Sequence, residues 1–424
     1  MNLSSLSKPE LEKYYQEQLE AYENYKALGL KLDMSRGKPT TSQLSLTNEM
    51  LTHCLDGDYT SERGVDCRNY GVLDGIYEAK RLFMPMIGVG RWEIIIGGNS
   101  SLQLMYDTIA RAMLLGVKGS PKPWCKCERV KWLCPSPGYD RHFAICEAFG
   151  IEMITVPMLS DGPDMDIVEK LVAEDPDIKG IWCVPRYSNP TGVVYSDQVI
   201  KRFARLNPAA PDFRIYWDDA YCVHSLTQKR AEILNILDEC KETGKQDMPL
   251  IFTSTSKISF PGGGIAAIGA SEENIAFMTK QMSFQIIGYD KLNQLRHARF
   301  FKNYDGILEH MKKHRAILKP KFELVQEKLK ALEGMGIAEW TKPTGGYFVS
   351  FEGLEGTAKR TVELCREAGV TLTNAGATFP YGKDPKDTNI RIAPTYPELD
   401  ELDKALDIFL VAYKVAACEA LLKA

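Results

Sequence analysis

The 424-residue sequence lacks the features that would mark a membrane-bound or nucleic-acid-binding protein. It has no block of basic residues, and its formal net charge of -4 is mild, so we expect no nucleic-acid partner. The longest apolar stretch near the C-terminus, Leu406 to Leu422, is interrupted by charged residues and predicts an amphipathic helix, not a membrane span. The N-terminus has no apolar signal core, so we expect a cytoplasmic protein with no membrane partner.

The sequence also lacks a disulfide or metal-binding pattern. Its eleven cysteines are odd in number and scattered in spacing, which is typical of reduced thiols in the cytosol. Cys125 and Cys127 are the one close pair, and no second pair or histidine cluster completes a zinc site around them. We therefore predict no bound metal.

What is present predicts a soluble protein with two domains, since 424 residues are more than one core usually holds. Strands and helices alternate from about residue 93 to 270, which predicts an α/β fold with a mostly parallel sheet flanked by helices. Later helices and short strands predict a smaller α+β domain. We expect an N-terminal segment (1–55) that joins the small domain, a large domain (56–310) and a small C-terminal domain (311–424).

The strand that begins near Ile251 ends in hydroxyl residues and is followed by Lys257. Ligands in parallel sheets bind at the carboxyl ends of strands. A lysine with a lowered pKa at such a place can condense with an aldehyde, and Ser254 and Ser256 are placed to bind an anion such as a cofactor phosphate. Taken alone, however, a lysine at a strand end is most often a solvated surface residue.

A second candidate anion site follows the strand near residues 93–96. Asn99, Ser100 and Ser101 stand after two glycines and at the start of a predicted helix, where backbone N–H groups and the helix dipole favour an anion. The alternative is an ordinary strand-to-helix turn with a serine cap. The pattern matches neither of the common nucleotide-binding loops, so nucleotide binding is not indicated.

Other strands of the predicted sheet also end in polar residues, and together these suit a pyridine aldehyde phosphate. Asp218 could keep the ring nitrogen protonated. Asn189 and Tyr221 could donate hydrogen bonds to the ring oxygen, and Tyr139 could stack on the ring. Separately, Asp218 could be a helix cap, Asn189 part of a turn and Tyr221 a core residue. So many such residues on successive strand ends of one sheet are unlikely to coincide by chance.

These stretches resemble the fold-type I pyridoxal-phosphate aminotransferases, in the aspartate aminotransferase group. The likeness covers roughly residues 30 to 395. It is carried by Gly37 before a proline, Tyr70 before a glycine, Gly97 to Leu102, Pro137-Gly138-Tyr139, Asn189 to Gly192, Asp218-x-Ala220-Tyr221, Ser254-x-x-Lys257 and Asn389-Ile390-Arg391.

The resemblance implies a catalytic set of Lys257, Asp218 and Tyr221. Lys257 would hold pyridoxal 5'-phosphate as a Schiff base and shuttle the proton. Asp218 would pair with the pyridine nitrogen, while Tyr221 and Asn189 would bind the ring oxygen. Arg391 would bind the α-carboxylate of the amino acid or 2-oxo acid substrate.

The resemblance also implies how the cofactor is held and how the chain assembles. Tyr139 would stack on the ring. Tyr70 would reach the phosphate of the neighbouring subunit, so a homodimer is expected. The phosphate would lie among Asn99, Ser100, Ser101, Ser254 and Ser256.

The sequence departs from the family at two places. Most members have a phosphate-binding arginine eight positions after the lysine, where this chain has Ile265. The arginine that reads the distal carboxylate of aspartate has no clear counterpart, since residues 281–289 contain none. The loop around Arg36 and Gly37 resembles a divergent subgroup of aspartate aminotransferases, so Arg36 is the candidate reader. Arg186 is a second possibility, or else a solvated charge.

We therefore predict transamination between L-aspartate and 2-oxoglutarate. Aminotransfer from another donor (alanine, an aromatic amino acid or 2-aminoadipate) and a pyridoxal-dependent C–S β-lyase stay open as alternatives. A non-catalytic effector-binding module is a more remote one.

Overall fold

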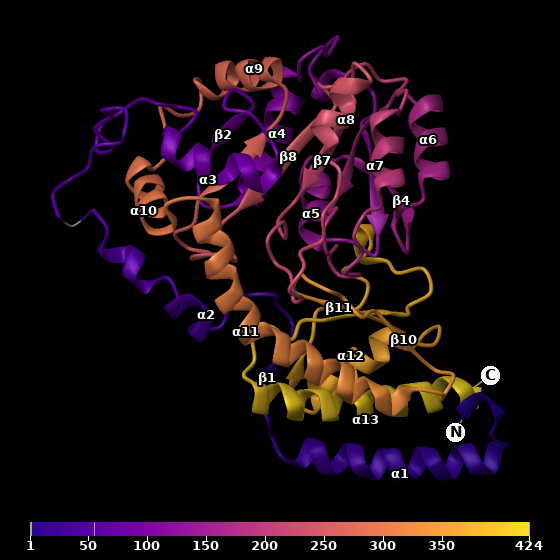
Figure 1. Ribbon diagram of the computed structural model, residues 1–424. Coiled ribbons are helices and arrows are strands. Elements are labelled where there is room, and N and C mark those ends of the chain that lie inside the picture. The colour runs from indigo at the N-terminus through magenta and orange to yellow at the C-terminus, as the bar shows by residue number, and fades with distance from the viewer. Residues whose placement is uncertain (1, 55, 424) are drawn as a thin grey trace.

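An eight-stranded mixed sheet forms the upper body of the molecule in the computed structural model, which describes residues 2–54 and 56–423 (Figure 1). The five central strands run parallel, whereas β9 is antiparallel to both of its neighbours and β5 is antiparallel to β4. In spatial order the strands are β2 (Ile94–Ile96), β9 (Ala266–Gly269), β8 (Pro249–Ser254), β7 (Arg214–Asp218), β6 (Ile178–Cys183), β3 (Lys131–Ser136), β4 (Glu152–Leu159) and β5 (Gly162–Pro163).

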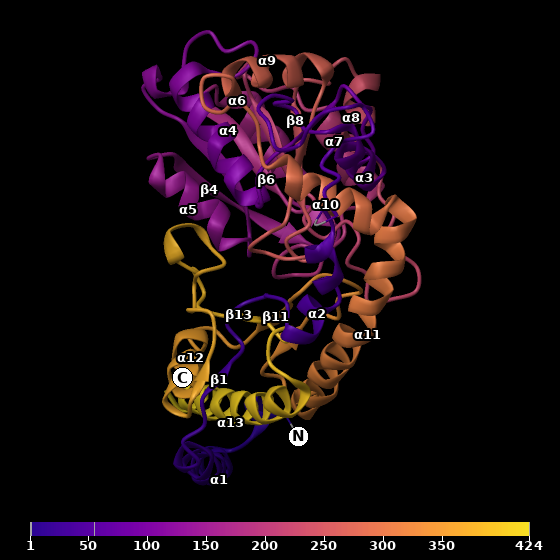
Figure 2. The ribbon, with the colours of Figure 1, turned by 90° about the vertical axis from the view of Figure 1, so that its left-hand side faces the viewer.

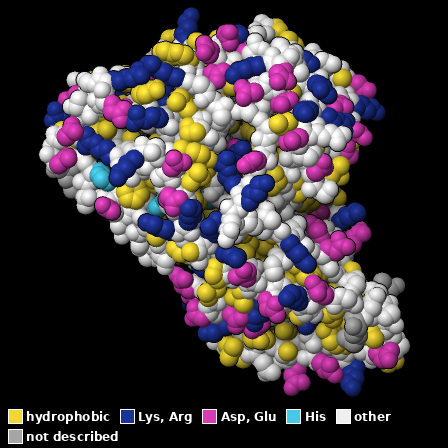
Figure 3. Space-filling model, viewed as in Figure 1, with side chains coloured by type: hydrophobic (Ala, Val, Ile, Leu, Met, Phe, Trp, Pro, Cys, Tyr) yellow, Lys and Arg dark blue, Asp and Glu magenta, His cyan; other side chains and the backbone are white. Residues whose placement is uncertain are grey.

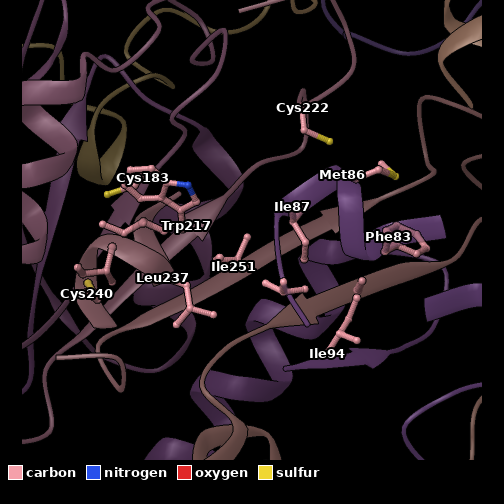
Figure 4. Close-up of a cluster of buried hydrophobic side chains, with 14 of the residues drawn as sticks. Phe83, Met86, Ile87, Ile94, Cys183, Trp217, Cys222, Leu237, Cys240 and Ile251 are labelled. Carbon is pink, nitrogen blue, oxygen red and sulfur yellow. The ribbon is translucent and has the colours of Figure 1, made fainter. Parts of the chain in front are cut away.

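Helices cover both faces of this sheet (Figure 2). One face packs against α3 (Tyr77–Ile87), α6 (Met165–Glu174), α7 (Asp197–Ala204), α8 (Ile236–Glu242) and α10 (Lys291–Phe301). The other packs against α4 (Ser101–Leu115), α5 (Asp140–Ala148) and α9 (Glu272–Met282). Because both faces are covered, β6, β7 and β8 are buried along their whole length, as parallel strands usually are. Figure 4 labels residues of the first of these cores, among them Phe83 and Met86 of α3 and Trp217 and Ile251 of the sheet.

The lower body combines the two ends of the chain. A three-stranded antiparallel sheet of β10 (Glu339–Trp340), β11 (Val349–Glu352) and β13 (Asn389–Ile392) packs with α12 (Ala358–Glu367) and α13 (Leu399–Lys423). The N-terminal helix α1 (Lys8–Ala27) lies along α13, and β1 (Leu32–Asp33) pairs in parallel with β12 (Val370–Thr371). The short elements of the chain are α2 (Thr41–Ser45) and the 3-10 helices η1 (Leu3–Ser5), η2 (Asn48–Thr52), η3 (Trp124–Lys126), η4 (Lys330–Leu332) and η5 (Pro380–Gly382).

The long helix α11 (Tyr304–Leu329) connects the two bodies (Figure 1). Its first turns contribute Ile307 and Met311 to the core of the upper body, and later turns contribute Leu318 and Phe322 to that of the lower body. The expected domain boundary at residue 310 therefore falls inside a continuous helix, and the one at residue 55 lies outside the described residues. The division into domains stays a prediction.

The alternation of strands and helices predicted from about residue 93 to 270 is confirmed in the upper body, where it runs from β2 to β9. The short strand β5, which returns antiparallel against the end of β4, was not predicted. All eleven cysteines are free thiols. Among the described residues, no helix is long and apolar enough to span a bilayer.

Candidate active site

A cavity of about 600 Å³ lies at the carboxyl ends of the parallel strands, between the upper and lower bodies. The sheet side of its lining consists of Ser100, Ser101, Leu102, Met105, Tyr139, Asp140, Arg141, Val184, Asn189, Asp218, Ala220, Tyr221, Ser254, Ser256 and Lys257. The other side consists of residues 35–38, Phe348, residues 371–374, Ala377 and Arg391. In the space-filling view, Lys and Arg side chains lie beside the groove between the two bodies (Figure 3).

Lys257 lies three residues beyond the end of β8, in a tight turn closed by backbone hydrogen bonds from Ile258 and Ser259 to Thr255. Its Nζ atom is 5.0 Å from the ring centroid of Tyr221 and 5.7 Å from that of Tyr347. Burial lowers the pKa of Lys257, and the negative charge of Asp218 opposes this shift only in part. A lysine in these surroundings is more readily deprotonated, as a nucleophilic amine must be.

Asp218 is the last residue of β7, and its two carboxylate oxygens differ in their surroundings. Oδ2 is 2.9 Å from Nε2 of His142, whose ring stacks on Trp182 at 4.3 Å between centroids. Oδ1 is buried and has no hydrogen-bond partner among the residues that the structure describes. Because an unsatisfied buried carboxylate oxygen is costly, this atom suits a cationic N–H donor such as a protonated pyridine.

Sequence reasoning missed His142. It stands on the first turn of α5, three residues after Tyr139, and the two rings meet edge to face with centroids 4.9 Å apart. The i, i+3 spacing from Tyr139 places both side chains on one side of the helix and could have indicated the contact. Which strand end that side would face is decided by the packing of α5 on the sheet.

The predicted ring-oxygen ligands, Tyr221 and Asn189, both line the cavity. Burial raises the pKa of Tyr221 well above its usual value, so this phenol stays protonated and can donate a hydrogen bond. The side-chain oxygen of Asn189 accepts a hydrogen bond from Arg391 at 3.3 Å. That contact directs the amide nitrogen, the donor end of the side chain, away from Arg391.

Four serines form the candidate phosphate pocket: Ser100, Ser101, Ser254 and Ser256. Ser254 Oγ donates to Ser256 Oγ at 3.0 Å, and Ser256 Oγ donates to the backbone carbonyl of Asn99 at 3.2 Å. Ser100 is the N-cap residue of α4 but its side chain makes no capping hydrogen bond, so the first N–H groups of the helix are not capped by it.

Three residues discussed for phosphate binding lie elsewhere. The side chain of Asn99 does not line the cavity and donates to the carbonyl of Pro261 at 3.3 Å. Ile265 is buried, and its N–H donates to Thr255 Oγ1 at 3.0 Å, so it supports the lysine turn from behind. Tyr70 is 81% exposed on the outer surface and lies outside this cavity, and its role toward a second subunit stays a prediction.

Arg391, on β13, lies on the lower side of the cavity with its guanidinium 4.9 Å above the ring of Phe348. Its Nη1 atom is 2.7 Å from Oδ1 of Asp140, and its Nη2 atom is 3.3 Å from Oγ1 of Thr373. Gly37 packs against the tip of the same Phe348 ring, and any β-carbon at position 37 would overlap that ring. The glycine is thus required for the ring that supports Arg391.

Three further cationic side chains line the cavity: Arg36, Lys38 and Arg141. Arg36 and Arg141 are exposed and, within the described residues, form no ion pair. The ammonium of Lys38 lies 3.7 Å from the ring centroid of Tyr396. Neither Lys38 nor Arg141 was predicted, because nothing in the local sequence distinguishes them from ordinary surface cations.

Arg186 was a weaker candidate for the same task, and both interpretations of it were wrong. It is neither in the cavity nor solvated. It is buried and forms an ion pair with Asp219, whose side chain is also buried. Asp219 follows Asp218 directly, but its only charged partner within the described part of the chain is this arginine.

Comparisons with known proteins agree with this geometry. Residues 6–424 match the family model of aspartate amino-transferases. A Corynebacterium glutamicum protein named aspartate aminotransferase is 44% identical over 399 residues, covering 94% of this chain and 92% of the relative. The crystal structure of an aspartate transaminase from the same species superimposes with a TM-score of 0.97 at 42% identity, over 99% of both chains. An α-aminoadipate aminotransferase from Thermus thermophilus shares the fold, with a TM-score of 0.74 at 20% identity over 93% of both chains.

Proposed function

The chain belongs to the aspartate aminotransferase family, and we propose that it transfers the amino group of L-aspartate to 2-oxoglutarate with pyridoxal 5'-phosphate as its cofactor. The observation that carries this proposal is the charge of the cavity. Besides Lys257, four cationic side chains line it, against the two carboxylates of Asp140 and Asp218. The cations are Arg36, Lys38, Arg141 and Arg391.

The protein groups around the cavity fit the cofactor. The unpartnered Oδ1 of Asp218 suits the protonated ring nitrogen, Tyr221 and Asn189 offer donors for the ring oxygen, and Tyr139 offers a ring to stack on. The phosphate would be held by the four serines and the uncapped N-terminus of α4. When bound, pyridoxal phosphate supplies an electron sink for the electrons left when the substrate Cα loses its proton.

Lys257 is the residue proposed to move protons. Burial lowers its pKa and so favours the neutral amine, which would take the proton from the substrate Cα as a general base. Asp218 would stabilise the positive charge of the ring nitrogen, and His142 fixes the orientation of the Asp218 carboxylate from behind.

A dicarboxylic substrate presents two carboxylates, and each needs its own cationic partner in the cavity. Arg391 would bind the α-carboxylate, because it is the one arginine of the cavity that is held rigidly, by Asn189, Thr373 and the Phe348 ring. The distal carboxylate of aspartate or 2-oxoglutarate needs a second cation. Arg36 is our first candidate, with Arg141 as its nearest rival, because both line the cavity and neither pairs with a carboxylate among the described residues.

We further propose a cytoplasmic homodimer in which Tyr70 reaches the partner's active site. Three exposed aromatic or aliphatic side chains support a second copy at this surface: Tyr70 (81% exposed), Phe284 (76%) and Ile287 (62%). Gly71 and Gly288 lie in direct contact, which brings Tyr70 and Ile287 into one neighbourhood. The free cysteines support a reducing compartment.

The decisive experiment compares kcat/KM for aspartate and for alanine in four variants: Arg36→Ala, Arg141→Ala, Arg391→Ala and, as a control, Arg366→Ala. Arg366 is exposed on α12 and lies outside the cavity. Loss of Arg391 should harm both donors. Loss of the distal reader should harm aspartate by about 2–5 kcal/mol and spare alanine, because only the dicarboxylate then leaves a charge unpaired.

Several results would contradict the proposal. If the wild-type protein prefers a neutral or aromatic donor, the assignment to aspartate is wrong. If amino acids release pyruvate and ammonia instead of converting the cofactor to its amino form, the protein is a β-lyase. If amino acids bind and cause neither change, it is an effector-binding module.

A further inference from the structure

The proposed α-carboxylate site already contains a carboxylate of the protein. Asp140, the first residue of α5, places its Oδ1 atom 2.7 Å from Nη1 of Arg391. The side chain of Asp140 is 31% exposed and lines the cavity, whereas that of Arg391 is only 7% exposed. Asp140 therefore lies where the guanidinium meets the space that a substrate would enter.

The hydrogen bonds of Arg391 leave little room for a second carboxylate. Nη1 donates both to Asp140 and to Asn189, and Nη2 donates to Thr373. Nε is buried and has no hydrogen-bond partner within the described part of the chain. A carboxylate binds a guanidinium best through two parallel N–H groups, one from each of two nitrogens. With Nη1 fully engaged and Nε buried, Arg391 can offer this arrangement only after one of its present partners moves away.

Asp140 is the partner most suited to move. Asn189 is buried, whereas Asp140 and Thr373 both lie partly exposed at the wall of the cavity. Of these two, Asp140 is the one whose charge repels an incoming carboxylate. A displaced Asp140 carboxylate can be hydrated there. A buried guanidinium without any counter-charge would be costly, so Asp140 also explains how Arg391 is stabilised before substrate binds.

We propose that Asp140 sets the affinity of the enzyme for its substrates by competing with their α-carboxylate for Arg391. This inference rests on the proposed function in one respect, namely that Arg391 binds the α-carboxylate. Substrate binding then exchanges one ion pair for another, and the net gain is smaller than the new ion pair alone would give. Since every amino acid and 2-oxo acid carries the α-carboxylate, the effect applies equally to all of them.

A purely structural role for Asp140 predicts the opposite result. If Asp140 only oriented Arg391, its removal would leave the guanidinium misplaced and would weaken binding. If Asp140 competes, its removal strengthens binding. The direction of the change therefore separates the two roles.

The test measures the dissociation constant of succinate, a dicarboxylate that lacks an amino group and cannot react, by titration calorimetry with the cofactor-loaded enzyme. Asp140→Asn and Asp140→Ala are expected to bind succinate about tenfold more tightly than the wild type. KM for aspartate and for alanine should fall by similar factors. The control is Glu147→Gln, which removes the same charge from an exposed position of the same helix outside the cavity and should leave succinate binding unchanged.

A double variant connects the effect to Arg391. In the Arg391→Ala background, Asp140→Ala should give no gain in succinate affinity. Unchanged or weaker binding by folded Asp140→Ala, or a gain that persists without Arg391, would overturn the inference. If Arg391→Ala alone binds succinate as tightly as the wild type, the assignment of Arg391 in the proposed function fails instead, so the two failures can be distinguished.

Discussion

Mild acid should destabilise this protein by more than the protonation of its carboxylates can explain, because four buried histidines surround the turn that carries Lys257. They come from the loop after β7 and from α10 and α11. Each has a ring nitrogen within hydrogen-bond distance of the turn: His224 3.3 Å from the Lys257 carbonyl, His310 and His314 2.9 and 3.1 Å from the Ile258 carbonyl, and His297 2.8 Å from Ser259 Oγ. Protonation of these rings would require a buried charge beside the lysine.

The size of the effect follows from the pKa values. Burial lowers the pKa of His224 and His314 to about 3 and that of His297 to about 4, and it also lowers the pKa of His310. In the unfolded chain a histidine titrates near 6.5, so between about pH 6.5 and these lower values the unfolded state binds more protons. The histidines therefore cost no stability above about pH 6.5, and the free energy of unfolding falls as the pH decreases below that value. At pH 5, each of the three histidines whose pKa falls to about 3 or 4 (His224, His297 and His314) lowers the free energy of unfolding by about 2 kcal/mol. Together they lower it by about 6 kcal/mol.

The assay is urea unfolding, followed by tryptophan fluorescence, at pH 7, 6 and 5 for the wild type and for His314→Gln. Glutamine can still donate to the Ile258 carbonyl but does not titrate. The loss of unfolding free energy between pH 7 and pH 5 should therefore be smaller in the variant by about 2 kcal/mol, even if the variant is less stable at pH 7. Contributions from carboxylates are common to both proteins and cancel. An equal pH dependence in the two proteins would refute the reasoning.

Two further predictions concern the neighbouring residues Asp218 and Asp219, which have different tasks, and Gly37. Asp218→Ala should retain the fold and lose turnover by orders of magnitude, whereas Asp219→Ala should retain the cofactor spectrum but lose about 3–5 kcal/mol of stability, because it leaves the buried Arg186 unpaired. Turnover and urea unfolding of both variants check this, and the reverse pattern would contradict it. Gly37→Ala should raise KM for aspartate and alanine alike and cost about 1–3 kcal/mol of stability, because the added methyl group displaces the Phe348 ring beneath Arg391. Steady-state kinetics with unchanged KM values would contradict that prediction.

The sequence was sufficient for those parts of the site that depend on local order along the chain. Parallel strands bring their carboxyl ends to one edge, so residues that follow successive strands, such as Asp218 and Lys257, had to meet once the alternation of strands and helices was recognised. The same logic located Asn189 and Tyr221. It depends only on strand direction, which the alternation predicts well.

The rest depends on how helices and loops are rotated, which local patterns do not specify. Asn99 and Ser100 are adjacent, yet only Ser100 lines the cavity, because the chain turns between them. Arg186 is close to Asn189 in sequence but points to the other side of the sheet edge, where Asp219 neutralises it. The two-residue strands β1 and β12, which join the N-terminal segment to the lower body, are too short to carry a recognisable pattern.

Asp140 illustrates why such residues escape a reading of the sequence. An aspartate at the start of a helix is explained locally by the helix dipole, so it attracts no further attention. Only the fold brings Arg391, 251 positions away, against it. The two carboxylates of the cavity then prove to be complementary. Among the described residues, one buried oxygen of Asp218 has no partner, while Asp140 is paired with the guanidinium that we propose as the α-carboxylate site. Unsatisfied polar atoms are costly in a protein interior, and the proposed cofactor would satisfy the one at Asp218. At Asp140 the protein supplies the partner itself, so under the proposed competition the cost of an empty carboxylate site is removed and the affinity for substrate is lowered in return.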